Sequence, residues 1–295
     1  MAITTLGQVY DGLRPQVLVV RALSGTAPPS LGVFTDIYVA GSVPAASPPS
    51  PGLPGVPLTT MVGALPFSNS ANPIYVAAIN RGGLQDYGLT FTATTNFTPT
   101  RMNYSLMLVD RLWHNSGLVA TSTASQNVNS VPWPDRDLNG SSDGEGVYLA
   151  LENSSATTNS NDTLTNNITV TYTNSAGTPA RTGTVVDMAY LTSAGNNFVR
   201  QGSWMPIGLQ AGDTGVRSVQ SVQFGTTFGT GPVLHLVAYR PIAFTMSRGN
   251  KDSSTAEDAI TLALPQLWNN SVLQTVYFQY SAYPPPNYQV SLTQG

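Results

Sequence analysis

Residues 105–152 read SLMLVDRLWHNSGLVATSTASQNVNSVPWPDRDLNGSSDGEGVYLALE, and this stretch decides the fold class. An apolar strand at 106–109 runs into a polar, tryptophan-bearing turn at 110–117. A connection rich in Ser and Thr, a Pro-Trp-Pro corner and an acidic, glycine-rich loop then lead to a second apolar strand at 147–151. Two apolar strands joined by a long loop predict one side of a β-sandwich.

The rest of the chain repeats this pattern of short strands. They are rich in Val, Thr, Tyr and Leu and are separated by Gly, Asn and Ser clusters, which is typical of a sandwich or barrel. In residues 168–173 apolar side chains alternate with threonines, so one face is expected to point into a core. The sequence therefore predicts an all-β fold built on a β-sandwich, jelly-roll-like domain. The expected strands are 16–22, 33–40, 74–80, 89–95, 104–110, 117–122, 147–152, 167–172, 184–191, 216–224, 233–239, 271–280 and a last strand ending at Leu292.

The two ends of the chain are predicted to differ from this core. A short helix is expected within 1–16. Residues 41–57 hold six prolines in seventeen residues and predict an extended segment, because proline cannot donate to a sheet. This segment is either a surface loop or an arm that lies over a neighbouring subunit. Near the C-terminus, Ser254 and Glu257 match a capping box ahead of an apolar stripe interrupted by Pro265, which predicts one short helix. The expected domains are an N-terminal arm (1–60), a β-sandwich core (61–250) and a C-terminal helix with strands (251–295).

Charge is scarce throughout the sequence. Only 9% of the residues are Asp, Glu, Lys or Arg, whereas about 25% is usual in soluble proteins. Ser, Thr, Asn, Gly and Pro take their place, which predicts a surface of neutral hydrogen-bonding groups. Such a surface suits a protein packed against many neighbours, because few charges must be desolvated on contact.

Composition also excludes several classes of partner. The net charge is −3 and the basic residues are scattered, so a nucleic-acid-binding surface is not expected. The sequence has no cysteine, hence no disulfides and no thiolate metal sites. The N-terminus lacks the pattern of a secretory signal, and no apolar run reaches the roughly 20 residues that a membrane helix needs. We expect synthesis in the cytoplasm, no membrane association, and delivery by assembly.

Candidate catalytic groups are few. His114 falls in the expected turn and His235 in an alternating strand, and we expect a structural role for each. Residues 140–144 spell G-x-S-x-G, but a nucleophile elbow needs a strand before this motif and a helix after it. Here a polar loop precedes the motif and a strand follows it. The sequence therefore predicts a protein that is not an enzyme.

The acidic loop is the one candidate metal site. Its oxygen-bearing side chains recur at alternating positions with a glycine at the sixth place, as in an EF-hand calcium loop. The twelfth place, however, is Gly146 instead of glutamate. Calcium or another hard cation is one hypothesis for this loop, and a solvated acidic turn without any cofactor is the other. The candidate ligands are Asp135, Asp137, Asn139 and Asp143.

Five stretches of the sequence carry a resemblance to a known group of proteins. They are LVDRLWHN (108–115), ITVTYTNSAG (168–177), PIGLQAGDTGVRSV (206–219), DAIT (258–261) and the terminal TQG (293–295). In these stretches the chain resembles structural proteins of tailed-bacteriophage virions. The resemblance implies a non-enzymatic capsid decoration or cement protein on the outer surface of the phage head, made in the host cytoplasm. Its partners would be the major capsid protein and copies of itself, assembled as a homotrimer.

Three further hypotheses remain open beside this one. The chain could be a tail, baseplate or head-fibre protein of the virion. It could instead bind host glycans by stacking sugars on Trp113, Trp133 or Tyr283. An enzyme of the depolymerase type would use Asp135 and Asp137 as paired carboxylates.

Overall fold

The computed structural model describes the strands and most of the loops between 104 and 227. The described residues are 13–20, 34–36, 56–57, 74–81, 104–128, 130–153, 168–185, 203–227, 230, 233–246, 256–258, 266–268, 271, 273–279 and 288–294. All regular elements within these ranges are β-strands, which confirms the predicted all-β class. The strands are β1 (Leu13–Val20), β2 (Phe34–Asp36), β3 (Val56–Pro57), β4 (Ile74–Arg81), β5 (Tyr104–Leu118), β6 (Gln126–Asn127), β7 (Tyr148–Asn153), β8 (Thr169–Asn174), β9 (Arg181–Val185), β10 (Ser203–Gly208), β11 (Val216–Gln223), β12 (Leu234–Met246), β13 (Ala256–Asp258), β14 (Gln266–Leu267), β15 (Leu273–Gln279) and β16 (Tyr288–Gln294).

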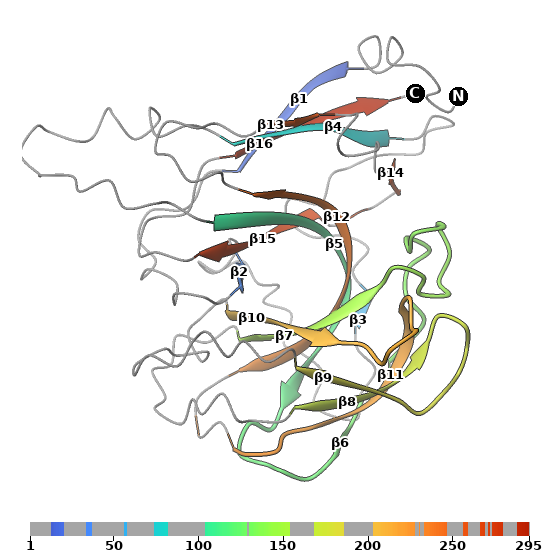
Figure 1. The fold of residues 1–295 in the computed structure, drawn as a ribbon. Helices are drawn as coiled ribbons and strands as arrows, with labels where there is room; N and C mark the ends of the chain where they lie inside the picture. The colour runs from blue at the N-terminus through green and yellow to red at the C-terminus, as the bar shows by residue number, and fades with distance from the viewer. Residues whose placement is uncertain are drawn as a thin grey trace, which may run out of the picture.

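Eleven of these strands form one antiparallel sheet that curls into a half-barrel (Figure 1). Its order is β2-β15-β5-β12-β7-β10-β9-β8-β11-β6, and β3 pairs with β5. β2 also pairs with β10, where Phe34 lies opposite Trp204, so six of the strands (β2, β15, β5, β12, β7 and β10) are joined in a ring. Register shifts between β5 and β12 sharpen the bend of the two longest strands. In the described part of the chain, the curl of one sheet thus encloses the main core, in place of the two facing sheets of the predicted jelly-roll sandwich.

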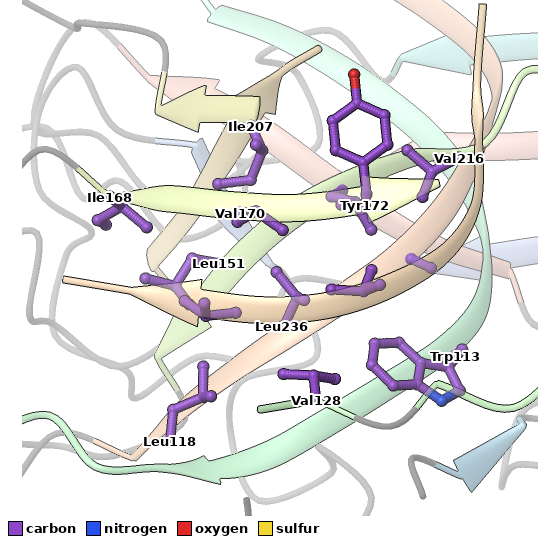
Figure 2. Packing of buried hydrophobic residues seen from close by; sticks show 14 of the residues in the cluster. Trp113, Leu118, Val128, Leu151, Ile168, Val170, Tyr172, Ile207, Val216 and Leu236 are labelled. Atoms are coloured by element: carbon purple, nitrogen blue, oxygen red, sulfur yellow. The ribbon is translucent and has the colours of Figure 1, made fainter. Parts of the chain in front are cut away.

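The main core lies inside this curl. Ile168, Val170 and Tyr172, from β8 and the residue before it, belong to this core together with Leu151 of β7 and Leu236 of β12 (Figure 2). The threonines between them point away from the core, so β8 alternates between buried and partly exposed positions. The alternation predicted from the sequence is therefore confirmed at this strand.

The segment after β5 protects the outer edge of β11. Trp133 Nε1 donates a hydrogen bond to the backbone carbonyl of Val216 (2.6 Å). The backbone N–H of Val219 donates to Ser130 Oγ (2.7 Å). An uncovered strand edge is a template for pairing with another chain. These side chains occupy backbone groups of β11 that a further strand would otherwise use.

The central strands β5, β7 and β12 are buried on both faces. Opposite the main core, Val109, Trp204, Val237 and Val276 form a second core inside the ring of six strands. A strand covered on both faces has no solvent-exposed row for its polar residues. For this reason every residue from 108 to 115 is buried, including four that are polar or charged.

A second sheet brings together strands from the two ends of the chain. Its order is β1-β16-β4-β13, and β14 pairs with β4 as well. β1 runs antiparallel to β16, from Leu13 opposite Thr293 to Val20 opposite Tyr288. Strands of the predicted regions 1–60 and 251–295 therefore share one sheet, while the domain limits themselves remain a prediction.

The turn predicted at 110–117 is wrong. β5 continues through these residues, because their polar side chains find partners inside the protein and the strand does not need to reach solvent there. β10 was not among the expected strands, and Pro206 lies in its middle. It pairs with β7 all the same, and Pro206 lies opposite Ala150.

The two helix predictions fail where the structure describes their residues. Ala256–Asp258, in the first turn of the expected C-terminal helix, is strand β13 and pairs with β4. β1 begins at Leu13, inside the expected N-terminal helix. In both places pairing with a distant strand outweighs a local helix signal, which is a weak determinant by itself. Other predictions lie outside the described residues: the strand 89–95, Tyr283, and the proline-rich segment except for Val56–Pro57.

Candidate functional site

The acidic loop at 135–146 is organised around the carboxylate of Asp137. Asp137 Oδ1 accepts hydrogen bonds from the backbone N–H groups of Asn139 and Ser141, both at 2.8 Å. Asp137 Oδ2 accepts from Ser141 Oγ (2.7 Å) and from the backbone N–H groups of Gly144 (3.1 Å) and Glu145 (3.2 Å). Five donors of the loop itself therefore surround this buried carboxylate.

These hydrogen bonds also determine the charge state of Asp137. Burial raises the pKa of its carboxyl group, but the hydrogen bonds from Ser141, Asn139 and Glu145 outweigh burial and lower the pKa below the ordinary value. Asp137 is thus an anion held by N–H and O–H donors. A cation site would need those same oxygens to point at a metal.

The side chains of the other three candidate ligands lie at the protein surface. Asp135 and Asn139 are exposed, and Asp143 forms a surface ion pair with Arg217 (3.0 Å). Within the described ranges there is no group of three or more acidic or histidine side chains placed to hold a metal ion. The calcium hypothesis therefore remains a prediction, and the hydrogen bonding of Asp137 favours the alternative, an ordered acidic turn.

Two neighbouring segments fix the loop in place. Trp268 Nε1 donates to the backbone carbonyl of Asp137 (2.8 Å), and its ring covers Gly140, where a Cβ would lie 2.6 Å from the ring. On the other side Gly144 meets Gly215, and a Cβ on Gly144 would overlap the backbone carbonyl of Val216. Glycine is required at these contacts because the backbones approach too closely for a side chain.

A second cluster of polar side chains lies inside the ring of six strands. Arg111 forms a two-pronged ion pair with Glu152, from Nη1 to Oε1 (3.1 Å) and from Nη2 to Oε2 (2.7 Å). Arg111 Nη1 also donates to Gln274 Oε1 (3.2 Å). His114 and His235 lie beside this pair, with their rings edge to face and centroids 6.0 Å apart. All five side chains are at most 5% exposed.

The two histidines are neutral in this environment. Burial, together with the charge of Arg111 and the proximity of His235, lowers the pKa of His114 to about 3. Burial also lowers the pKa of His235 to about 4, although Glu152 opposes the shift. The structural role expected for each histidine fits these positions, but His114 lies in strand β5 and not in a turn.

A third network connects β5 to the acidic loop and to the segment before β15. Asp110 Oδ2 accepts hydrogen bonds from Arg136 Nε (3.1 Å) and from Ser271 Oγ (2.8 Å). Arg136 also donates to the backbone carbonyl of Arg111 (3.1 Å). Ser271 Oγ in turn accepts from the backbone N–H of Trp268 (3.2 Å). Buried charges are tolerated when they are paired and hydrogen-bonded in this way.

The turn before β11 holds a further cluster that sequence analysis did not single out. The Asp213 carboxylate accepts from Tyr172 Oη (2.6 Å), Asn174 Nδ2 (2.8 Å) and Arg181 Nε (2.9 Å). The hydrogen bond from Arg181 is the main reason that the pKa of Asp213 falls to about 2. The four residues come from β8, β9 and the turn, so no local pattern in the sequence marks them as partners.

The tryptophans proposed for sugar stacking are in the core. Trp113 and Trp133 are buried and pack against each other with ring centroids 5.2 Å apart. They have no exposed face on which a sugar could stack.

Comparison with other proteins gives no relative. No protein-family model, curated protein or solved structure matches this chain. Among the described residues, no helix is long and apolar enough to span a membrane. The buried networks bind strands and loops of the curled sheet to one another.

Proposed function

We propose that this chain is a non-enzymatic structural protein of a tailed-bacteriophage virion and acts as a capsid decoration or cement protein on the outer head surface. The major capsid protein and further copies of the chain, as a homotrimer, are its partners. The stretches that resemble phage virion proteins are the main support for this proposal. Three of them, 108–115, 168–177 and 206–219, form strands and turns of the same curled sheet.

One structural relationship carries the argument. The stretches 168–177 and 206–219 are distant in sequence, yet β8 and β11 pair along their length, and Asp213 binds Tyr172 and Asn174 across them. Together with β9 they present outward positions at which neutral hydrogen-bonding side chains predominate, although Arg217 of β11 is also exposed. The neutral residues are Thr169, Thr171, Thr173, Thr182, Thr184, Ser218, Gln220, Ser221 and Gln223.

Such a face suits repeated contact with a shell. Neutral polar groups lose little on desolvation compared with charges, and they can exchange hydrogen bonds with water for hydrogen bonds with a neighbour. When many copies sit on a symmetric shell and each protomer makes several contacts, modest individual contacts give stable attachment. The proline-rich segment 41–57, which the sequence predicts to be extended, is proposed to add a further contact as an arm.

Particle analysis tests this proposal. In purified virions the chain should be present in hundreds of copies and should be located on the head by electron cryo-microscopy. Particles that lack it should release DNA sooner on heating or osmotic shock. A handful of copies at the tail would support the tail or baseplate hypothesis instead. Absence from mature particles would reject both.

A pair of variants tests the proposed face. Thr184→Arg introduces a charge on β9, and Thr121→Arg introduces the same charge on the exposed loop after β5. We expect Thr184→Arg to reduce occupancy on particles that lack the native protein, while Thr121→Arg binds normally. Equal binding by both variants would show that this face does not contact the shell.

A further inference from the structure

Asn139 is the only asparagine in the sequence that is followed by glycine. It is exposed at the tip of the acidic loop, and its carboxamide has no hydrogen-bond partner among the residues that the structure describes. Asn174, which is followed by Ser175, differs in this respect. Its carboxamide donates to Asp213 Oδ1 (2.8 Å) and accepts from the backbone N–H of Thr178 (2.8 Å).

We propose that Asn139 is a site of spontaneous deamidation, and that the hydrogen-bonded loop around Asp137 sets the rate of this modification. The reaction needs only water and the chain itself. Glycine after asparagine favours it, because the missing side chain leaves the backbone nitrogen of Gly140 accessible to the Asn139 carboxamide.

The chemistry is an intramolecular substitution. The backbone nitrogen of Gly140 loses its proton to solvent and attacks Cγ of Asn139. A new carbon–nitrogen bond forms, the bond from Cγ to the carboxamide nitrogen breaks, and ammonia leaves with the proton. The resulting five-membered succinimide is opened by water at either carbonyl, which gives aspartate or isoaspartate at this position. No oxidant or reductant takes part.

The loop opposes the first step of this reaction. The backbone N–H of Gly140 donates to the carbonyl of Asp137 (3.2 Å), so the attacking nitrogen is engaged in the closed loop. The backbone N–H of Asn139 is held by Asp137 Oδ1 (2.8 Å), and the Trp268 ring covers Gly140. Attack on Cγ requires Gly140 to turn away from these contacts. The closed loop therefore protects Asn139, and local opening exposes it.

Modification would then keep the loop from closing again. A succinimide has no N–H at Gly140, so the hydrogen bond to the Asp137 carbonyl is lost. Isoaspartate lengthens the backbone between positions 139 and 140, and Asp137 Oδ1 can no longer accept from both Asn139 and Ser141 in the same geometry. Because Trp268 binds the Asp137 carbonyl, the change also loosens the contact between the loop and the segment before β15.

The experiment incubates the full chain at mildly alkaline pH in ¹⁸O-labelled water and follows each asparagine by peptide mapping and isoaspartate quantification. The native protein is compared with the urea-unfolded chain, with Asp137→Ala, which removes the central carboxylate, and with Trp268→Phe, which replaces the indole by a smaller ring without an N–H. Asn139→Gln is the negative control, because a longer side chain closes the ring slowly. Asn174 serves as the internal reference.

We expect labelled product at Asn139 in the native protein, none at Asn174, and a rate that rises about tenfold or more when the loop is opened by either variant. If Asp137→Ala does not fold, Trp268→Phe and sub-denaturing urea provide the comparison. If Asn139 gives no product in the native protein and the folded variants while the unfolded chain reacts, Asn139 is not a deamidation site of the folded protein. If the rates are equal in the native protein, the variants and the unfolded chain, the loop does not set the rate of deamidation.

Discussion

Trp268 and Asp137 are joined by a 2.8 Å hydrogen bond from the indole nitrogen to the backbone carbonyl, across 131 positions of the chain. The bond attaches the segment before β15 to the acidic loop. The same indole ring covers Gly140. A contact made by one side chain thus connects two parts of the chain that the sequence places far apart.

The contact between Trp268 and Gly140 can be measured with a double-mutant cycle. Gly140→Ala should destabilise the native protein by about 2–4 kcal/mol, because the new Cβ meets the indole ring at a positive φ. In a Trp268→Ala background the same change should cost about 1–2 kcal/mol, since only the backbone strain remains. Urea unfolding of the four proteins gives the coupling energy. Equal costs in the two backgrounds would mean that the ring and Gly140 are not in contact.

Gly144 and Gly212 form a matched pair for the close approach of loop and strand. Both have a positive φ, but a Cβ on Gly144 would overlap the Val216 carbonyl, whereas a Cβ on Gly212 meets nothing within 4 Å. We expect Gly212→Ala to cost about 1–2 kcal/mol and Gly144→Ala to cost more than about 4 kcal/mol or to prevent folding. Thermal unfolding and soluble yield compare them. Similar stability of the two variants would contradict the close approach.

Because Arg111 and Glu152 form a buried ion pair, we expect the effects of replacing each on the free energy of unfolding not to be additive. Either Arg111→Met or Glu152→Leu alone should destabilise the protein by about 3–5 kcal/mol, because a buried charge loses its partner. The double variant should recover much of this loss, since no unpaired charge is left. The exposed pair of Asp143 and Arg217 is the control, and Arg217→Ala should cost about 0–1 kcal/mol. Denaturant unfolding of each variant gives these values. Additive losses in the double variant would contradict the pairing.

The two buried histidines predict a loss of stability in mild acid. Below the ordinary pKa of 6.5 the unfolded chain takes up protons on both, whereas the folded protein does so only near pH 4 at His235 and pH 3 at His114. The unfolded state therefore binds more protons in this window, so the free energy of unfolding falls as the pH drops from about 6.5 toward 4. The pKa of Asp213 is lowered to about 2, so protonation of this carboxylate lowers the free energy of unfolding only below about pH 4.

Replacing both histidines tests this assignment. In the double variant His114→Gln, His235→Gln, the free energy of unfolding should change much less between pH 7 and 5 than in the native protein, whatever its absolute value. The midpoints of urea unfolding across this range give the comparison, provided that the slope of the free energy with urea concentration stays constant. An equally steep loss in the double variant would assign the acid sensitivity to other groups.

The sequence predicted the fold correctly where the pattern of residues one or two positions apart determines the local structure. The alternation of Val170 and Tyr172 with threonines identifies β8 correctly, because an inward and an outward face leave a period of two in the sequence. The sequence also identifies the acidic loop as a distinct element. It does not show that Asp137 binds five donors of the same loop, because the direction of those N–H groups depends on backbone angles and not on residue type.

The remaining errors have a common cause. Arg111 and Asp110 suggested a turn because polarity is usually a mark of the surface, yet Glu152, Gln274 and Arg136 satisfy them inside the protein. The one signal that could have identified them is the presence of charges within otherwise apolar strands of a chain that has so few charges. Ser254 and Glu257 suggested a helix on local grounds, but β4 offers a strand edge to residues 256–258.

The sequence by itself determined the class of the protein, because its short alternating strands specify an all-β chain. The tertiary structure decided which strands meet, that the sheet curls over its own core, and that β5, β7 and β12 are buried on both faces. The physical reason is the range of the interactions. Side-chain periodicity is set by residues one or two positions apart, whereas a buried ion pair such as Arg111 with Glu152 exists only when strands 41 positions apart are brought together.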